Sequence, residues 1–189
     1  MAVLISMQKV FLNGDFIDKD SAKISIFDRG FIFGDGIYEV VPVINGVMVE
    51  KQGFWDRFKR SLNEIDLSLP YSKDEFENIL NELIKINSLN EGGIYIQITR
   101  GIAQRDFSFV SGITPTVMAF AFSDSVLEHP GAKSGITIIS TPDIRWKRRD
   151  IKSISLLGQC YAKNQATIAG ADECFMVEDG YVTEAGSSS

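Results

Sequence analysis

The sequence predicts a mixed α/β fold with two domains, the second of them incomplete in this chain. Over residues 1–122, β-rich runs occur together with two helical segments, which indicates a small α/β domain. Residues 123–134 contain Pro and Gly, and we interpret them as an interdomain linker. Residues 135–189 begin a second domain of about 55 residues, a size at which a hydrophobic core is marginal by itself. Because the chain stops on GYVTEAGSSS, we expect it to be a fragment of something longer.

The elements of the first domain follow from local patterns. Residues 9–17, KVFLNGDFI, predict two strands joined by a turn at Asn13-Gly14, and residues 46–54 contain another short strand. Apolar residues recur at helical spacing over 54–65. Ser72 and Glu75 form a capping-box pattern that opens a second helix. The buried stripe of that helix is predicted to comprise Phe76, Ile79, Leu80, Leu83 and Ile84.

The remaining elements are mostly strands. Residues 93–101, GIYIQITRG, and residues 116–122, TVMAFAF, are predicted to be neighbouring strands of one sheet. In the second domain, a strand is predicted at 135–140 and a helix from about Leu156 to Ala169, stopped at Gly170. Residues 173–177 and 181–183 then form a hairpin around the turn 178–180.

Composition and charge exclude several classes of function. The net charge of −6 argues against a nucleic-acid binder, which normally shows a basic patch. No apolar run is long enough to span a bilayer, and the start lacks the features of a secretory signal. Cys160 and Cys174 fit no metal spacing, and we interpret them as buried thiols of a cytoplasmic protein. The only histidine, His129, lies in the linker, so proton transfer falls to Lys, Tyr, Asp or Glu.

Several residues are candidates for a binding or catalytic site. Residues 27–41, FDRGFIFGDGIYEVV, contain three glycines that allow tight turns before Tyr38 enters a strand, and this stretch alone favours a structural corner over a functional site. Arg57 lies near the apolar face of its predicted helix, so it needs a paired anion. That anion is either a phosphate, bound in bidentate fashion, or the carboxylate of an internal salt bridge.

Two further candidates follow the same reasoning. Arg100 and Arg105 flank the residues that follow the strand 93–99. Arginines at such a strand end can bind a substrate carboxylate, and the alternative is that both lie on the surface of a loop. Lys152 stands among Ile151, Ile154, Leu156 and Leu157. Burial among them is expected to lower its pKa and leave the neutral amine populated, as a Schiff-base lysine requires, whereas a solvated surface lysine is the plain alternative.

Taken together, these stretches resemble the fold-type IV pyridoxal 5'-phosphate (PLP) enzymes, and most of all the D-amino acid aminotransferases. The resemblance runs in order through FLNG, DRGFIFGDGIYEVV, DRFKRS, YIQITRG, DIRWKRRDIKSISLLGQCYAKNQA and GYVTEAGSSS. It therefore covers nearly the whole chain. It implies a PLP-dependent transaminase that moves an amino group from an amino acid, such as D-alanine, to a 2-oxo acid, and that acts as a cytoplasmic homodimer with no metal.

The resemblance also assigns roles to single residues. Lys152 would hold PLP as a Schiff base and shuttle the proton, while Arg57 would bind the cofactor phosphate. Glu184 would pair with the pyridine nitrogen, which strengthens the ring as an electron sink. Tyr38 would line the substrate side, and Arg105 would bind the substrate carboxylate. The stretch under the cofactor would comprise Ser187, Ser188 and Ser189.

Two departures from the family pattern leave alternatives open. The D-amino acid enzymes pair the carboxylate-binding arginine with a histidine two residues on, but this chain has Phe107, which weakens the D-amino acid assignment. Family members also continue well beyond residue 189, and the missing part completes the cofactor site. Branched-chain aminotransferases and aminodeoxychorismate lyases share the lysine and the glutamate, and a truncated PLP-binding remnant without turnover is a further alternative.

Overall fold

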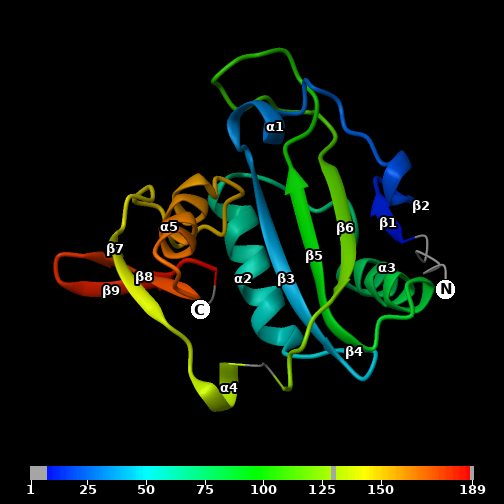
Figure 1. Ribbon diagram of the computed structural model, residues 1–189. Coiled ribbons are helices and arrows are strands. Elements are labelled where there is room, and N and C mark those ends of the chain that lie inside the picture. Colours follow the sequence, from blue (N-terminus) through cyan, green and yellow to red (C-terminus); the bar gives the residue numbers. More distant parts are fainter. Residues whose placement is uncertain (1–7, 129–130, 188–189) are drawn as a thin grey trace. The chain divides into compact units, whose positions relative to one another are not determined.

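The computed structural model describes residues 8–128 and 131–187 and forms two compact units (Figure 1). The first unit contains the chain up to Leu127 together with Asp150–Ile154, and the second contains Glu128–Arg149 and the residues from Ser155 onward. A short segment of the later sequence is therefore part of the first unit. The domain limits expected from the sequence, 1–122 and 135–189 around a linker at 123–134, stay a prediction.

The first unit is built on a six-stranded antiparallel sheet with the order β2-β1-β6-β5-β3-β4. The two long central strands, β3 and β5, pair along their whole length, from Gly36 with Thr99 to Ile44 with Glu91. The strands are β1 (Lys9–Leu12), β2 (Asp15–Asp18), β3 (Gly36–Ile44), β4 (Val47–Met48), β5 (Glu91–Thr99) and β6 (Thr116–Ser123). The hairpin at Asn13-Gly14 and the β5–β6 pairing are confirmed.

Two long helices, α2 (Lys51–Glu64) and α3 (Lys73–Ile86), lie beside this sheet (Figure 1). Helix α2 starts three residues before the predicted Phe54. The capping box at Ser72 is present, since its hydroxyl accepts from the Glu75 N–H and the Glu75 carboxylate accepts from the Ser72 N–H. The core combines apolar residues of both helices with the inward residues of β3 and β5, including Phe58, Phe76, Leu80, Ile37, Val41 and Ile96.

The stretch before β3 is a tight corner that contains the short helix α1 (Arg29–Phe33). Asp28 caps this helix by accepting from the Gly30 N–H, and the helix ends at Gly34 in the left-handed conformation. A side chain at Gly30 would collide with Thr99, because a Cβ there would lie 2.2 Å from the Thr99 methyl carbon. The structural interpretation of this stretch is thus supported, and its glycines allow close packing as well as turning.

The second unit contains a three-stranded sheet in which β7 (Ile138–Pro142) runs parallel to β8 (Glu173–Glu178), and β8 runs antiparallel to β9 (Tyr181–Ala185). Helix α5 (Leu157–Ile168) connects β7 to β8 and packs on both strands. Its end before Gly170 and the turn at Asp179-Gly180 agree with the sequence patterns. The predicted strand at 135–140 lies two to three residues further on, after the short helix α4 (Gly131–Ser134).

The two cysteines differ in exposure. Cys174 is buried as expected, but Cys160 is exposed, because it lies on a face of α5 that is turned away from the strands. Of the helices in the described residues, none is long and apolar enough to cross a membrane.

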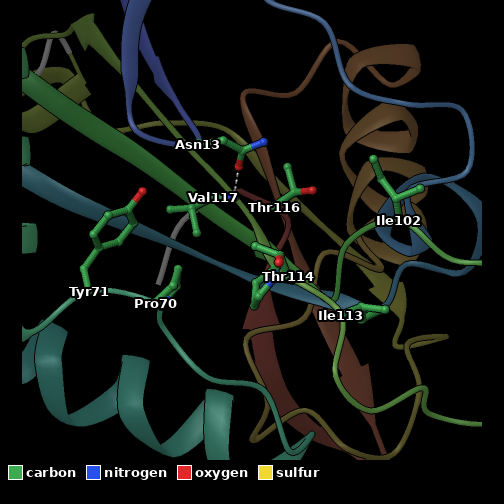
Figure 2. A pocket seen from close by; sticks show the side chains of 9 residues that line it. Asn13, Pro70, Tyr71, Ile102, Ile113, Thr114, Thr116 and Val117 are labelled. Carbon is green, nitrogen blue, oxygen red and sulfur yellow. Dashed lines mark hydrogen bonds between the residues drawn. The ribbon is translucent and has the colours of Figure 1, made fainter.

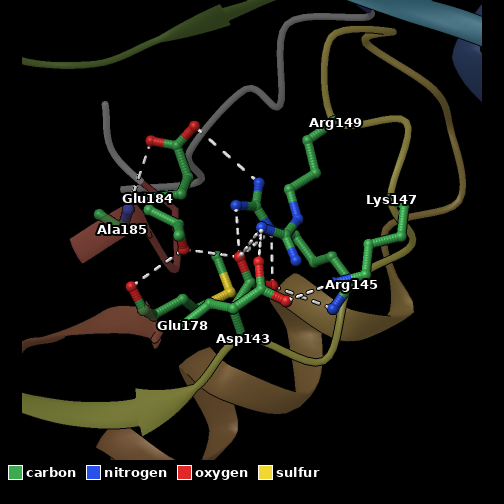
Figure 3. Close-up of polar contacts among 9 residues, drawn as sticks. Asp143, Arg145, Lys147, Arg149, Glu178, Glu184 and Ala185 are labelled. Carbon is green, nitrogen blue, oxygen red and sulfur yellow. Dashed lines mark hydrogen bonds and ion pairs between the residues drawn. The ribbon is translucent and has the colours of Figure 1, made fainter. Parts of the chain in front are cut away.

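A cluster of charged side chains joins the end of β7 to β8 and β9 in the second unit (Figure 3). The Asp143 carboxylate is fully buried and accepts from the Arg145 guanidinium at 2.8 Å and from the Thr183 hydroxyl at 2.6 Å. Arg149 bridges Asp143 and Glu178, with Nη1 2.6 Å from the Glu178 carboxylate. These contacts lower the pKa of Asp143 and hold the pKa of Glu178 at about 2.

This cluster predicts an acid-sensitive second unit. Both pKa values are lowered by folding, so the carboxylates contribute stability that is present above about pH 4.5 and is lost as the pH falls toward about 2. Asp143→Asn should reduce the free energy of unfolding at neutral pH by about 3 kcal/mol, because it removes the buried carboxylate to which Arg145 and Arg149 are paired. Urea unfolding at several pH values should also show a flatter acid dependence in the variant. An unchanged acid dependence would show that Asp143 does not contribute in this way.

Candidate active site

The segment Asp150–Ile154 is attached to the free edge of β3 by backbone hydrogen bonds. The Tyr38 N–H donates to the Lys152 carbonyl at 2.9 Å, the Ile154 N–H donates to the Gly36 carbonyl at 3.2 Å, and Ile37 and Ser153 form a bridge. The Lys152 N–H donates to the Ser61 hydroxyl of α2. The backbone on both sides of Lys152 is therefore fixed to the first unit.

The Lys152 side chain lies against Tyr38. Its ammonium nitrogen donates to the Tyr38 hydroxyl at 3.4 Å and lies 4.4 Å from the centre of the ring. Of its expected apolar neighbours, Ile151 is buried in the first unit, whereas Leu157 is 83% exposed and opens helix α5 of the second unit. The proximity of Leu157 to Lys152 stays a prediction.

An aromatic row extends from Tyr38 across the same face of the sheet. The Tyr38 ring stacks on Tyr95 of β5 with centroids 5.6 Å apart, and Tyr95 stacks on Phe120 of β6 at 5.0 Å. Burial, followed by the influence of Tyr38, raises the pKa of Tyr95 to about 12, so this hydroxyl keeps its proton. It donates to the side-chain oxygen of Gln97, the residue that pairs with Tyr38 across β3 and β5.

Arg57 projects from α2 to the strand residue that follows Tyr38. Its Nε and Nη2 atoms each donate to one oxygen of Glu39, both at 2.6 Å. The Glu39 side chain is 0% exposed, whereas that of Arg57 is 44% exposed. The hydrogen bond to Glu39 is the main cause that raises the pKa of Arg57, and Tyr38 adds to it. The internal salt bridge considered from the sequence is present, and Glu39 is the site residue that was missed.

The two arginines after β5 have different environments. Arg100 is buried and donates to Asp35 at 2.8 Å and to the carbonyls of Ile65 and Asp66, so it is a structural residue and cannot grip a substrate. Arg105 is exposed in the following loop. Its guanidinium carbon lies 5.0 Å from the centre of the Phe107 ring and 5.7 Å from that of Phe33.

The remaining predicted site residues belong to the second unit. Glu184 on β9 is partly exposed, with one carboxylate oxygen 4.0 Å from Nη1 of Arg145. The Ser187 hydroxyl donates to Glu173 at 2.6 Å. Ser188 and Ser189 lie outside the described residues.

Within the first unit, the structure brings Lys152, Tyr38 and Arg57 to one end of β3. A primary amine beside a phenol can attack an electrophilic carbonyl, and a partly exposed guanidinium can bind an anionic group. The arrangement therefore fits a ligand that carries both an aldehyde and a phosphate.

A separate open pocket of about 420 Å³ lies elsewhere on the first unit (Figure 2). Its lining is mostly apolar and includes Pro70, Tyr71, Ile102, Ile113 and Val117. None of the predicted site residues lines it, so we assign it no part in the chemistry.

Comparisons with known proteins agree with this geometry. Residues 36–189 match the family model described as amino-transferase class IV. A D-alanine aminotransferase of Staphylococcus haemolyticus is 44% identical over 183 residues, which are 96% of this chain and 64% of that protein. The chain thus spans less than two thirds of the length of this curated relative.

Solved structures show the same fold. A branched-chain amino acid aminotransferase from Escherichia coli matches with a TM-score of 0.81 at 17% identity, over 95% of this chain and 61% of that one. A putative 4-amino-4-deoxychorismate lyase from Legionella pneumophila matches with a TM-score of 0.76 at 25% identity, over 89% and 62%. The order of motifs, the lysine at the edge of β3 and the family match lead to one conclusion: the chain belongs to the amino-transferase class IV family, whose cofactor is PLP.

Proposed function

We propose that the protein is a PLP-dependent aminotransferase that moves an amino group from an amino acid, in the first place a D-amino acid such as D-alanine, to a 2-oxo acid. The observation that carries this proposal is the Lys152 amine, which lies against Tyr38 on a backbone segment fixed to β3. The likeness to the D-alanine aminotransferase of Staphylococcus haemolyticus supports the substrate class.

The residues present fit the cofactor. When bound, PLP supplies an electrophilic aldehyde and a ring that accepts electrons. Lys152 would hold the aldehyde end of the cofactor through its amine and would serve as the base that accepts the proton of the substrate Cα. Arg57 supplies guanidinium N–H groups for the phosphate, and Tyr38 holds the lysine amine through its hydroxyl.

Other parts of the proposal concern the second unit and the whole molecule. Glu184 would keep the pyridine nitrogen protonated, and the backbone and hydroxyls around Ser187, Ser188 and Ser189 would lie under the cofactor. We also propose that the protein acts as a homodimer in the cytoplasm. Exposed apolar side chains on the first unit, such as Ile26, Phe27 and Phe31, support burial against another surface.

The rival activities have weaker support. The branched-chain aminotransferase and the deoxychorismate lyase share the fold at 17% and 25% identity, well below the 44% of the D-alanine enzyme. The loop around Arg105 counts against D-amino acid specificity. Phe107 stands where the D-amino acid enzymes have a histidine, and it cannot donate to a carboxylate.

The covalent role of Lys152 predicts a specific label. Borohydride reduction of the intact protein with bound PLP, followed by peptide mapping, should place the pyridoxyl group on Lys152. Lys152→Ala should abolish the label, because no other amine is held against Tyr38 in the described part of the chain. Labelling of Lys147 or Lys163 in its place would remove Lys152 from the proposed role.

The substrate role of Arg105 predicts a selective change in the Michaelis constant. Arg105→Ala should raise KM for amino acids about tenfold to a hundredfold, the effect of losing a charged hydrogen bond, and should leave KM for a primary amine without a carboxylate nearly unchanged. Lys59→Ala, which removes an exposed cation of α2, serves as the control.

A second variant at this loop tests stereospecificity. Phe107→His adds a donor beside Arg105 and should improve the turnover of D-alanine relative to an L-branched-chain amino acid. If the variant gains nothing with D-alanine and L-amino acids or primary amines are the better donors, the loop belongs to another specificity class.

A further inference from the structure

Glu39 is a carboxylate in a position that packing alone would fill with an apolar residue. On β3 it alternates with Ile37 and Val41, which point into the core, and its side chain is 0% exposed. A buried carboxylate is costly unless it is paired and hydrogen-bonded, and such a pair is often no more stabilising than apolar side chains of similar volume. The pair with Arg57 therefore calls for an explanation other than stability.

The pairing uses one edge of the guanidinium and leaves another open. Glu39 accepts from Nε and Nη2 of Arg57 at 2.6 Å each. A guanidinium has five N–H donors in a fixed plane, so the two N–H groups of Nη1 and the second one of Nη2 remain. Among the described residues, Nη1 of Arg57 has no acceptor, and the side chain is partly exposed. These three donors form an edge of the kind that binds phosphate in bidentate fashion.

We propose that Glu39 is a positioning residue that fixes the Arg57 guanidinium so that its open edge binds the phosphate of PLP. This inference rests on the proposed function, which supplies the phosphate. A free arginine side chain loses rotamer freedom when it binds, and a side chain already held in place loses less. The negative charge of Glu39 works in the opposite direction by weakening the attraction of Arg57 for phosphate. We infer that orientation outweighs this loss of charge.

Two ligands that differ only in the phosphate, PLP and pyridoxal, separate an effect on phosphate binding from a general effect on the site. The affinity of the intact protein for PLP and for pyridoxal, which lacks the phosphate, is measured by absorbance titration. Glu39→Gln keeps the size of the side chain but can accept from only one N–H of Arg57, so the guanidinium should lose its fixed orientation and one of its hydrogen bonds to the phosphate. PLP binding should therefore weaken about tenfold, the order of one charged hydrogen bond. Pyridoxal affinity should not change, because pyridoxal makes no contact with Arg57.

One control variant and a second variant at position 39 accompany this measurement. Glu77→Gln removes a carboxylate that pairs with Lys51 and Trp55 on the same pair of helices and should leave both affinities unchanged. Glu39→Asp keeps the charge but withdraws it by one methylene, so it should also weaken PLP binding relative to pyridoxal. Thermal unfolding of each variant shows whether it is folded, and Glu39→Asp replaces Glu39→Gln if the latter is not.

The possible results are distinct. Unchanged or tighter PLP binding in folded Glu39→Gln would overturn the inference and show that the carboxylate acts only through its charge or through packing. Equal losses for PLP and pyridoxal would also overturn it, since they indicate a general structural effect. If the parent protein binds PLP no better than pyridoxal, then the proposed phosphate role of Arg57 fails together with this inference. If Arg57→Lys weakens PLP binding selectively but Glu39→Gln does not, only the inference fails.

Discussion

The pairing of residues 150–154 with the edge of β3 is the constraint on which the site depends. Lys152 lies in the later part of the sequence, between β7 and α5 of the second unit, yet its backbone is bonded to Tyr38 and Ser61 of the first. The chain enters the first unit for residues 150–154 and then continues in the second unit. Because the backbone of this segment is hydrogen-bonded to β3 around Lys152, these bonds set the position of the amine beside Tyr38.

The arginines of the first unit differ in how far they are buried and paired within the fold. Arg29 of α1 and Arg100, which follows β5, share the Asp35 carboxylate and also donate to backbone carbonyls. Both are buried, so their guanidinium groups are not accessible to a ligand. Arg57 differs because Glu39 occupies only one edge of its guanidinium and the side chain is partly exposed. Of these three arginines, Arg57 is therefore the one that we propose binds a ligand.

Local elements could be predicted from the sequence because their signals are local. The turn at Asn13-Gly14, the capping box at Ser72 and the end of α5 before Gly170 each depend on a few adjacent residues. The motif order identified the fold family as well, and with it Lys152 as the amine of interest. Those signals describe neighbours in the chain, and they were sufficient for the helices and hairpins.

The polar partners could not be predicted because they come from distant parts of the chain. Arg100 was considered a possible substrate ligand, but Asp35, 65 residues earlier, buries it in an ion pair. The Glu39–Arg57 pair is an exception, because the sequence carries a signal for it: Glu39 occupies an inward position in the alternating strand 36–44, and Arg57 lies near the apolar face of its helix. The exposure of Leu157 and Cys160 depends on where α5 packs, which no local pattern gives.

The most direct test of the account is the absorption spectrum of the intact protein with PLP before and after the addition of an amino acid. If Lys152 both anchors the cofactor and exchanges with a substrate amine, the band of the bound cofactor should appear and then shift when D-alanine is added. Lys152→Ala should show neither the lysine-bound band nor catalytic turnover. A band that never shifts with D-alanine, an L-branched-chain amino acid or a primary amine would reduce the protein to a PLP binder, and the absence of any band would contradict the account.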